Sequence, residues 1–116
     1  MAFQEWQLGD LRDRIMTITK GQRLVYVTDT WYSDENRRKI VALAQDADLL
    51  CCEAMYLEQD LDYATERHHL TARQAGLLAR EANVKELVVF HFSQRYQECP
   101  EAIYHEAPEA FGGPVR

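Results

Sequence analysis

Residues 24–29 read LVYVTD, a continuous apolar run that ends in a hydroxyl and a carboxylate. Two further runs have the same form: LLCC at residues 49–52 is followed by Glu53, and LVVF at residues 87–90 is followed by His91. Each run is continuous rather than alternating, which is typical of a strand covered on both faces. The three runs therefore predict a buried, largely parallel sheet.

Helical patterns lie between and after these runs. Residues 34–47 place apolar side chains on one side, with Ser33 or Asp34 as the candidate N-cap. Residues 71–74, TARQ, have the form of a capping box, which begins a helix, and residues 100–111 give the last helical pattern. Strands that alternate with helices indicate βαβ units and hence an α/β fold.

The outer parts of the chain have weaker patterns. Residues 15–19, IMTIT, favour a β-strand and precede a turn signal, so they predict a hairpin partner for residues 24–27. Residues 1–14 are polar with scattered apolar positions and are predicted to be an N-terminal arm or linker, and residues 112–116 a tail. One domain is therefore expected over residues 15–111.

Composition excludes several classes of protein. The 116 residues are 47% hydrophobic and 28% charged, which is ordinary for a globular domain and provides no run long enough to cross a membrane. The formal net charge of −6 argues against unaided binding of RNA or DNA. The three cysteines include an adjacent pair and form no C-x-x-C motif, which favours free thiols in a reducing cytoplasm over a cysteine zinc site.

The polar residues that follow the three apolar runs are candidates for chemistry. In parallel strands Asp29, Glu53 and His91 lie along one edge of the sheet, where α/β proteins place ligands. Two carboxylates and an imidazole suit a divalent metal or an acid–base site, and His69, just before a predicted helix, is a fourth candidate. Polar residues also end many strands without a function, and Glu53 could equally be a buried acid that orients a ligand.

Four motifs resemble those of ribonuclease Z-like enzymes of the metallo-β-lactamase superfamily. VTDT at residues 27–30 resembles the family's strand-end motif, and ADLLCCEA at residues 47–54 resembles the following strand with its acidic end. HLTARQAG at residues 69–76 is similar to the histidine-containing helix start, and VKELVVFHFSQRY at residues 84–96 resembles the last metal-ligand motif. The motifs occur in the family's order.

The resemblance implies a fold and a metal site. The fold would be the C-terminal half of a metallo-β-lactamase αββα sandwich, with one mixed sheet and helices packed mainly on one face. Two zinc ions would share Asp29, and His91 would bind one of them. His69 would donate a proton near the scissile phosphate, with Glu53 supporting that histidine. Two further residues would position the substrate or a loop, namely Arg95 and Tyr96.

The sequence also departs from the family's pattern. It has no H-x-H-x-D-H signature and lacks the further histidine ligand that follows it, and Gln94 stands where the family often has proline. The resemblance therefore predicts a zinc hydrolase that is inactive, with weak or no metal binding, until a missing N-terminal half or a partner copy completes it. RNA is an expected partner only of the complete enzyme, and no membrane partner is expected.

Other functions remain compatible with the same residues. The main alternative is a non-catalytic half-fold module that binds a partner or self-associates through an exposed sheet face. A metal-independent structural dimer is a separate class. A third alternative keeps the hydrolase but changes its substrate, because one fold serves many reactions.

Overall fold

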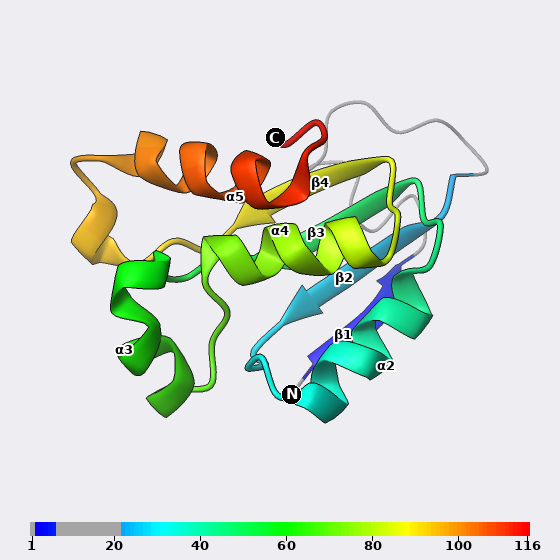
Figure 1. Ribbon diagram of the computed structural model, residues 1–116, viewed down its shortest axis with the longest axis horizontal. Coiled ribbons are helices and arrows are strands. Elements are labelled where there is room, and N and C mark those ends of the chain that lie inside the picture. Colours follow the sequence, from blue (N-terminus) through cyan, green and yellow to red (C-terminus); the bar gives the residue numbers. More distant parts are fainter. Residues whose placement is uncertain (1, 7–21) are drawn as a thin grey trace.

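The computed structural model describes residues 2–6 and 22–116, which form one mixed four-stranded sheet in the order β1-β2-β3-β4 (Figure 1). The predicted runs form three strands, β2 (Leu24–Thr28), β3 (Leu49–Glu53) and β4 (Glu86–Phe90). These strands pair in parallel, as their continuous apolar sequences predicted. β1 (Ala2–Trp6) pairs antiparallel with β2.

The strand beside β2 was not predicted at its observed place. Ala2 pairs with Thr28 and Trp6 with Leu24, so part of the segment expected to be an arm or linker belongs to the sheet. The predicted hairpin partner, residues 15–19, lies outside the described residues. A single edge strand depends on long-range pairing more than on its own sequence, which explains why its pattern was weak.

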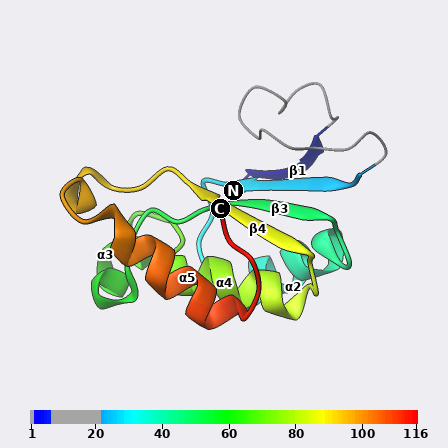
Figure 2. The ribbon, with the colours of Figure 1, turned by 90° about the horizontal axis from the view of Figure 1, so that it is seen from above.

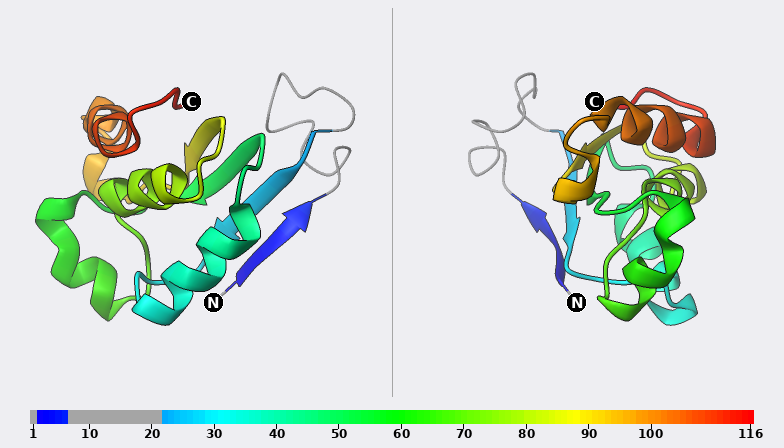
Figure 3. Two further views of the ribbon diagram at one scale, coloured as in Figure 1. Left: turned by 45° about the vertical axis from the view of Figure 1, so that its right-hand side comes forward. Right: turned by 90° about the vertical axis from the view of Figure 1, so that its left-hand side faces the viewer.

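The helices cover one face of the sheet, as predicted (Figures 2 and 3). The short 3₁₀ helices Glu58–Asp60, Gln94–Tyr96 and Pro100–Ala102 lie in the connections. The helix predicted over residues 34–47 ends at Ala44, and the helix at Leu61–Glu66 was not predicted. In the described part of the chain no helix is both long and apolar enough to cross a membrane. The α-helices are α2 (Asp34–Ala44), α3 (Leu61–Glu66), α4 (Ala72–Glu81) and α5 (Ile103–Phe111).

The predicted helix caps are present. The Ser33 side chain accepts a hydrogen bond from the backbone N–H of Asn36, so Ser33 is the N-cap of α2. At α4 the Thr71 hydroxyl accepts from the N–H of Gln74, and the Gln74 side chain accepts from the N–H of Thr71, each over 3.0 Å. Each N-cap stabilises its helix by about 1 kcal/mol, and this capping box fixes where the chain enters α4, directly after His69.

Apolar side chains of β2, β3 and β4 cover both faces of the sheet. Val25, Leu50 and Leu87 are fully buried on the helix side, while Leu24 and Cys51 belong to a separate cluster on the other face. This two-sided burial explains why the runs are continuous. All three cysteines, which lie in the described part, are free as expected, and burial raises the pKa of the Cys51 thiol to about 12.

The C-terminal tail adjoins the sheet. Gly112 ends α5 with a left-handed backbone, φ 77°, which glycine adopts without strain. The N–H of Leu87 then donates to the Pro114 carbonyl over 3.0 Å, and the N–H of Arg116 donates to the Leu87 carbonyl over 2.8 Å. The tail thus pairs with backbone groups of β4, which protects them from pairing with another chain.

Close packing of α4 on α5 makes Gly76 sensitive to substitution. A Cβ atom at Gly76 would lie 2.5 Å from the Ala107 carbonyl oxygen and 2.7 Å from the Ala110 Cβ. We expect Gly76→Ala to lower the free energy of unfolding by about 1–3 kcal/mol, because α5 must shift. Urea unfolding followed by circular dichroism measures this change.

A matched control separates packing from helix propensity. Arg80→Ala, at an exposed position of the same helix, should change the free energy of unfolding by no more than about 0.5 kcal/mol. The better helix propensity of alanine alone predicts that Gly76→Ala is at least as stable as the parent chain. That result would contradict the close approach of α4 and α5.

Candidate functional site

The carboxyl ends of the three parallel strands carry the predicted site residues. Asp29 follows β2, Glu53 ends β3 and His91 follows β4, at the edge of the sheet where the arrows of these three strands end in Figure 1. His69 joins them from the connection that precedes α4. Ligand sites of α/β proteins lie at this edge, because the strand ends converge there with open connections above them.

Glu53 is the centre of this cluster. Its side chain is fully buried, and each carboxylate oxygen accepts two hydrogen bonds. One oxygen accepts from Nδ1 of His69 over 2.7 Å and from the N–H of Leu70 over 3.3 Å. The other accepts from Nδ1 of His91 over 3.0 Å and from the Thr28 hydroxyl over 3.3 Å. A buried carboxylate is costly unless it is bonded in this way, so the four donors hold it in place.

The two bonds to Glu53 determine which nitrogen each histidine presents. A carboxylate oxygen can only accept, so Nδ1 of His69 and of His91 donates to Glu53, which leaves Nε2 of each ring for a metal ion or a proton. The two rings meet edge to face, with centroids 6.1 Å apart. Histidines that bind metals are usually oriented by a carboxylate on the other ring nitrogen. Glu53 thus fits the orienting role that the sequence left open.

Asp29 completes a group with the donor types of a metal site. One side-chain donor atom from each of Asp29, Glu53 and His69 lies within 4.8 Å of the others. Asp29 is exposed, so its carboxylate remains available at the rim of the site. Carboxylate oxygens and imidazole nitrogens are ligands of zinc, and a catalytic zinc takes three protein ligands. With Glu53 engaged by both imidazoles, these residues fit part of a metal site.

Strained backbone is concentrated at the same edge. Among the residues that the structure describes, five non-glycine residues have positive φ, and three of them are Asp29 (53°), His68 (59°) and His91 (62°). This conformation is uncommon for residues with a side chain and persists only where the surroundings impose it. Two predicted ligands are therefore held in specific directions at some cost in stability, a pattern that is typical of functional sites.

The two predicted positioning residues differ in their surroundings. Tyr96 is buried, its hydroxyl accepts from the N–H of Leu57 over 2.9 Å and donates to Asp60, and burial raises its pKa to about 12. Its contacts tie two loops together. Arg95 is exposed, forms an ion pair with Asp60 over 3.1 Å, and lies 5.5 Å from the ring centroid of Tyr56. The Tyr56 ring is 6.3 Å from that of His69, which places Arg95 beside the site.

Sequence reasoning missed Tyr56 and Asp60. Both belong to the connection after β3, where no periodic pattern or motif marks them. Tyr56 is buried between the site and α3, and its backbone N–H donates to the Leu70 carbonyl over 3.4 Å. The only available signal was an aromatic and an acid shortly after a strand that ends in a candidate ligand.

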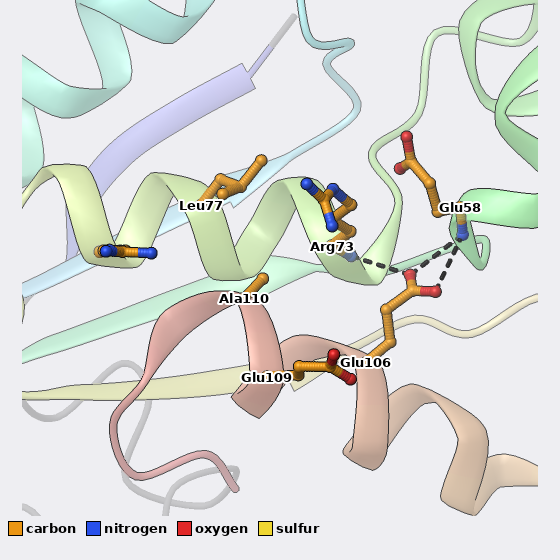
Figure 4. Close-up of a pocket in the computed structure, with 7 residues that line it drawn as sticks. Glu58, Arg73, Leu77, Glu106, Glu109 and Ala110 are labelled. Carbon is orange, nitrogen blue, oxygen red and sulfur yellow. Dashed lines mark hydrogen bonds between the residues drawn. The ribbon is translucent and has the colours of Figure 1, made fainter.

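Away from the predicted ligands, a hollow of about 610 Å³ lies between α4 and α5 (Figure 4). The Glu106 carboxylate accepts there from the backbone N–H of Glu58 over 3.0 Å and of Arg73 over 2.9 Å. Burial raises the pKa of Glu106, and these two bonds act in the opposite direction. Glu106 thus caps the first turn of α4 and attaches α5 to it. The hollow is lined by both acidic and basic residues and includes none of the predicted ligands.

Comparison with known sequences agrees with the motifs and the fold. The family described as "Beta-lactamase superfamily domain" matches residues 14–92, more than half of the chain. The chain is 40% identical over 108 residues to ribonuclease Z of Streptomyces coelicolor, covering 93% of this chain and 32% of that protein. It is 42% identical over 85 residues to ribonuclease Z of Protochlamydia amoebophila, covering 73% of this chain and 26% of that protein.

Solved structures give the same result. The metallo-β-lactamase fold protein YhfI from Bacillus subtilis matches with a TM-score of 0.71 and 26% identity, over 82% of this chain and 36% of that protein. The short form of human tRNase Z matches with a TM-score of 0.55 and 35% identity, over 66% of this chain and 29% of that protein. The chain thus spans only about a third of the length of these relatives. It belongs to the metallo-β-lactamase superfamily and is ribonuclease Z-like in sequence.

Proposed function

We propose that this chain supplies part of the active site of a metal-dependent, zinc-requiring hydrolase that cleaves a phosphodiester bond in RNA. The observation that carries the proposal is the bonding of Glu53 to Nδ1 of both His69 and His91, which leaves both Nε2 atoms available. Donor atoms of Asp29, Glu53 and His69 also lie within 4.8 Å of one another. The similarity to ribonuclease Z proteins supports RNA as the substrate, and a tRNA precursor is the specific substrate proposed.

The residues divide into holding and proton-transfer roles. Asp29 and Nε2 of His91 would hold zinc, which when bound supplies a water nucleophile of lowered pKa. Nε2 of His69 would donate a proton to the leaving oxygen, a role that requires the imidazole to be charged beforehand. Glu53 contacts Nδ1 of the same ring and keeps the ring in place.

The metal site needs ligands from outside this chain. Asp29 and His91 are two ligand residues, whereas a single catalytic zinc ion already takes three protein ligands. The sequence has no H-x-H-x-D-H signature, and the ribonuclease Z relatives are about three times as long as the part they share with it. We propose that the segment or partner that completes the fold brings that signature, and that the complete protein acts in the cytoplasm.

The chain alone is therefore expected to be inactive. With purified 116-residue chain and zinc, hydrolysis of bis(p-nitrophenyl) phosphate should not exceed the rate with zinc alone. Robust turnover that a chelator abolishes would contradict the incompleteness of the site.

A chimera provides the positive counterpart. In it, this chain replaces the aligned segment of Streptomyces coelicolor ribonuclease Z, which retains its own remaining residues. The chimera is expected to hydrolyse the same ester with zinc.

The alternative of a non-catalytic module is favoured by one observation. Tyr26, Val88 and Phe90 are only partly buried on the face of the sheet that lies away from the helices, and the Tyr26 and Phe90 rings stack with centroids 5.0 Å apart. Such a module would self-associate through this face, independently of metal. Sedimentation of the Asp29→Ala and His91→Ala variants of this chain tests the alternative. A non-catalytic module predicts that both variants self-associate as the parent chain does, and that the chimera is inactive.

A further inference from the structure

An exposed pair of aromatic rings lies beside the candidate site. Trp31, two residues after Asp29, leaves 37% of its surface exposed. Its ring stacks on that of His68, with centroids 5.7 Å apart and planes inclined by 22°. His68 is itself exposed and directly precedes His69. Neither the metal site nor the hydrophobic core uses these two rings.

Backbone contacts hold both residues in place. The Trp31 carbonyl accepts from the N–H of Ser33 over 2.9 Å and from the Asn36 side chain over 3.1 Å, which attaches Trp31 to the start of α2. His68 adopts a left-handed backbone, φ 59°, and its N–H donates to the Thr65 carbonyl over 3.3 Å. Two elements far apart in the sequence thus present stacked rings on fixed backbones, which reduces the entropy lost when a ligand binds.

Further aromatic and cationic side chains lie near the site. The ring of Tyr63, 43% exposed, lies 6.5 Å from that of Tyr56, which neighbours His69. The guanidinium of Arg95 lies 4.3 Å from the Tyr63 centroid, and that of Arg67 lies 5.4 Å from it. Proteins bind single-stranded nucleic acids with aromatic rings and guanidinium groups, because the flat face of every base can stack on them.

We infer that Trp31 and His68 form a stacking platform for one nucleobase of a single-stranded RNA next to the bond that is cleaved. This inference rests on the proposed function for the class of substrate. The net charge of −6 makes attraction of the phosphate backbone weak, so stacking is the contact by which this part of the enzyme can hold RNA. The platform positions a base, while the chemistry belongs to the neighbouring carboxylates and histidines.

The test measures binding by the 116-residue chain, without turnover. The probes are a four-nucleotide oligoadenylate and an abasic ribose-phosphate oligomer of equal length, titrated into ¹⁵N-labelled chain. The sequence has two tryptophans, and the indole signal that disappears in the Trp31→Phe variant is that of Trp31. Oligoadenylate should shift this signal and bind at least about fivefold more tightly than the abasic oligomer, since stacking of a base is worth about 1–3 kcal/mol.

Variants show whether the platform is responsible. Trp31→Ala should weaken oligoadenylate binding about tenfold, and Trp31→Phe should retain most of it. Tyr104→Ala, which removes an exposed ring from α5, should bind as the parent chain does. This binding measurement needs no metal. An inactive chimera would therefore contradict the proposed hydrolase activity and leave the binding result unaffected. Equal binding of the two oligomers, no binding, or a folded Trp31→Ala variant that binds normally would overturn the platform.

Discussion

Replacement of Glu53 with glutamine is expected to lower the free energy of unfolding of the chain by about 1–3 kcal/mol. The carboxylate accepts from two imidazoles, a backbone N–H and a hydroxyl while fully buried. An amide offers one acceptor oxygen and turns an NH₂ group toward one of the donors, which leaves buried N–H groups without acceptors. Urea unfolding of the two chains gives the difference directly.

The same substitution should weaken metal binding in the completed enzyme. Loss of the carboxylate behind a metal-binding histidine typically costs 10–100-fold in affinity. In the chimera we expect Glu53→Gln to raise the zinc dissociation constant by about that factor. Glu66→Gln, which changes an exposed carboxylate on α3, is the matched control and should leave stability and zinc affinity unchanged. Equal stability of Glu53→Gln and Glu66→Gln would show that the four bonds to Glu53 are not made.

Replacement of His69 with alanine should reduce turnover of RNA by the chimera about 10²- to 10⁴-fold, because a proton donor to the leaving oxygen is lost. A p-nitrophenyl ester tests this role specifically, since its leaving group departs without protonation. Turnover of this ester should fall much less. The measurement is kcat and KM for each substrate with parent and variant chimeras.

A second histidine provides the control for that experiment. His105, on the exposed side of α5, pairs only with Glu109 among the described ion pairs, and His105→Ala should leave both activities unchanged. If His69→Ala reduced turnover of RNA and of the p-nitrophenyl ester equally, His69 would act on the metal site or on folding rather than as a proton donor.

Much of the fold followed from local patterns in the sequence. The three apolar runs gave β2, β3 and β4, and the capping residues at Ser33 and Thr71 gave two helix starts, because these signals depend only on neighbouring residues. α3 has six residues, too few for a helical period to show. β1 is defined by pairing with β2, and a residue's distant partner is not encoded in its own neighbourhood.

In the site, too, local patterns predicted some features, while contacts between distant residues were missed. The strand ends predicted that Asp29, Glu53 and His91 would lie at one edge, because parallel strands place their carboxyl ends together. No local pattern could show that one carboxylate bonds to both histidines, since Glu53, His69 and His91 meet only in three dimensions. Tyr96 was predicted to position the substrate or a loop, and the partner of its hydroxyl, Asp60, is marked by no motif.

The family relationship limits what this chain can do by itself. It has the sheet, the helices and the histidine-carboxylate cluster, but spans about a third of its ribonuclease Z relatives. We therefore propose that Asp29 and His91 are ligands in a shared metal site, which hydrolyses a phosphodiester only after the other ligands are supplied.

Zinc-dependent hydrolysis by the chimera tests this claim most directly. With bis(p-nitrophenyl) phosphate, the account predicts turnover that a chelator abolishes and that zinc restores, and that Asp29→Ala lowers at least about 100-fold. The 116-residue chain alone should show none. A folded chimera that fails to hydrolyse the ester, or one whose turnover survives Asp29→Ala, would contradict the assignment of this edge of the sheet as half of a metal-dependent hydrolase site.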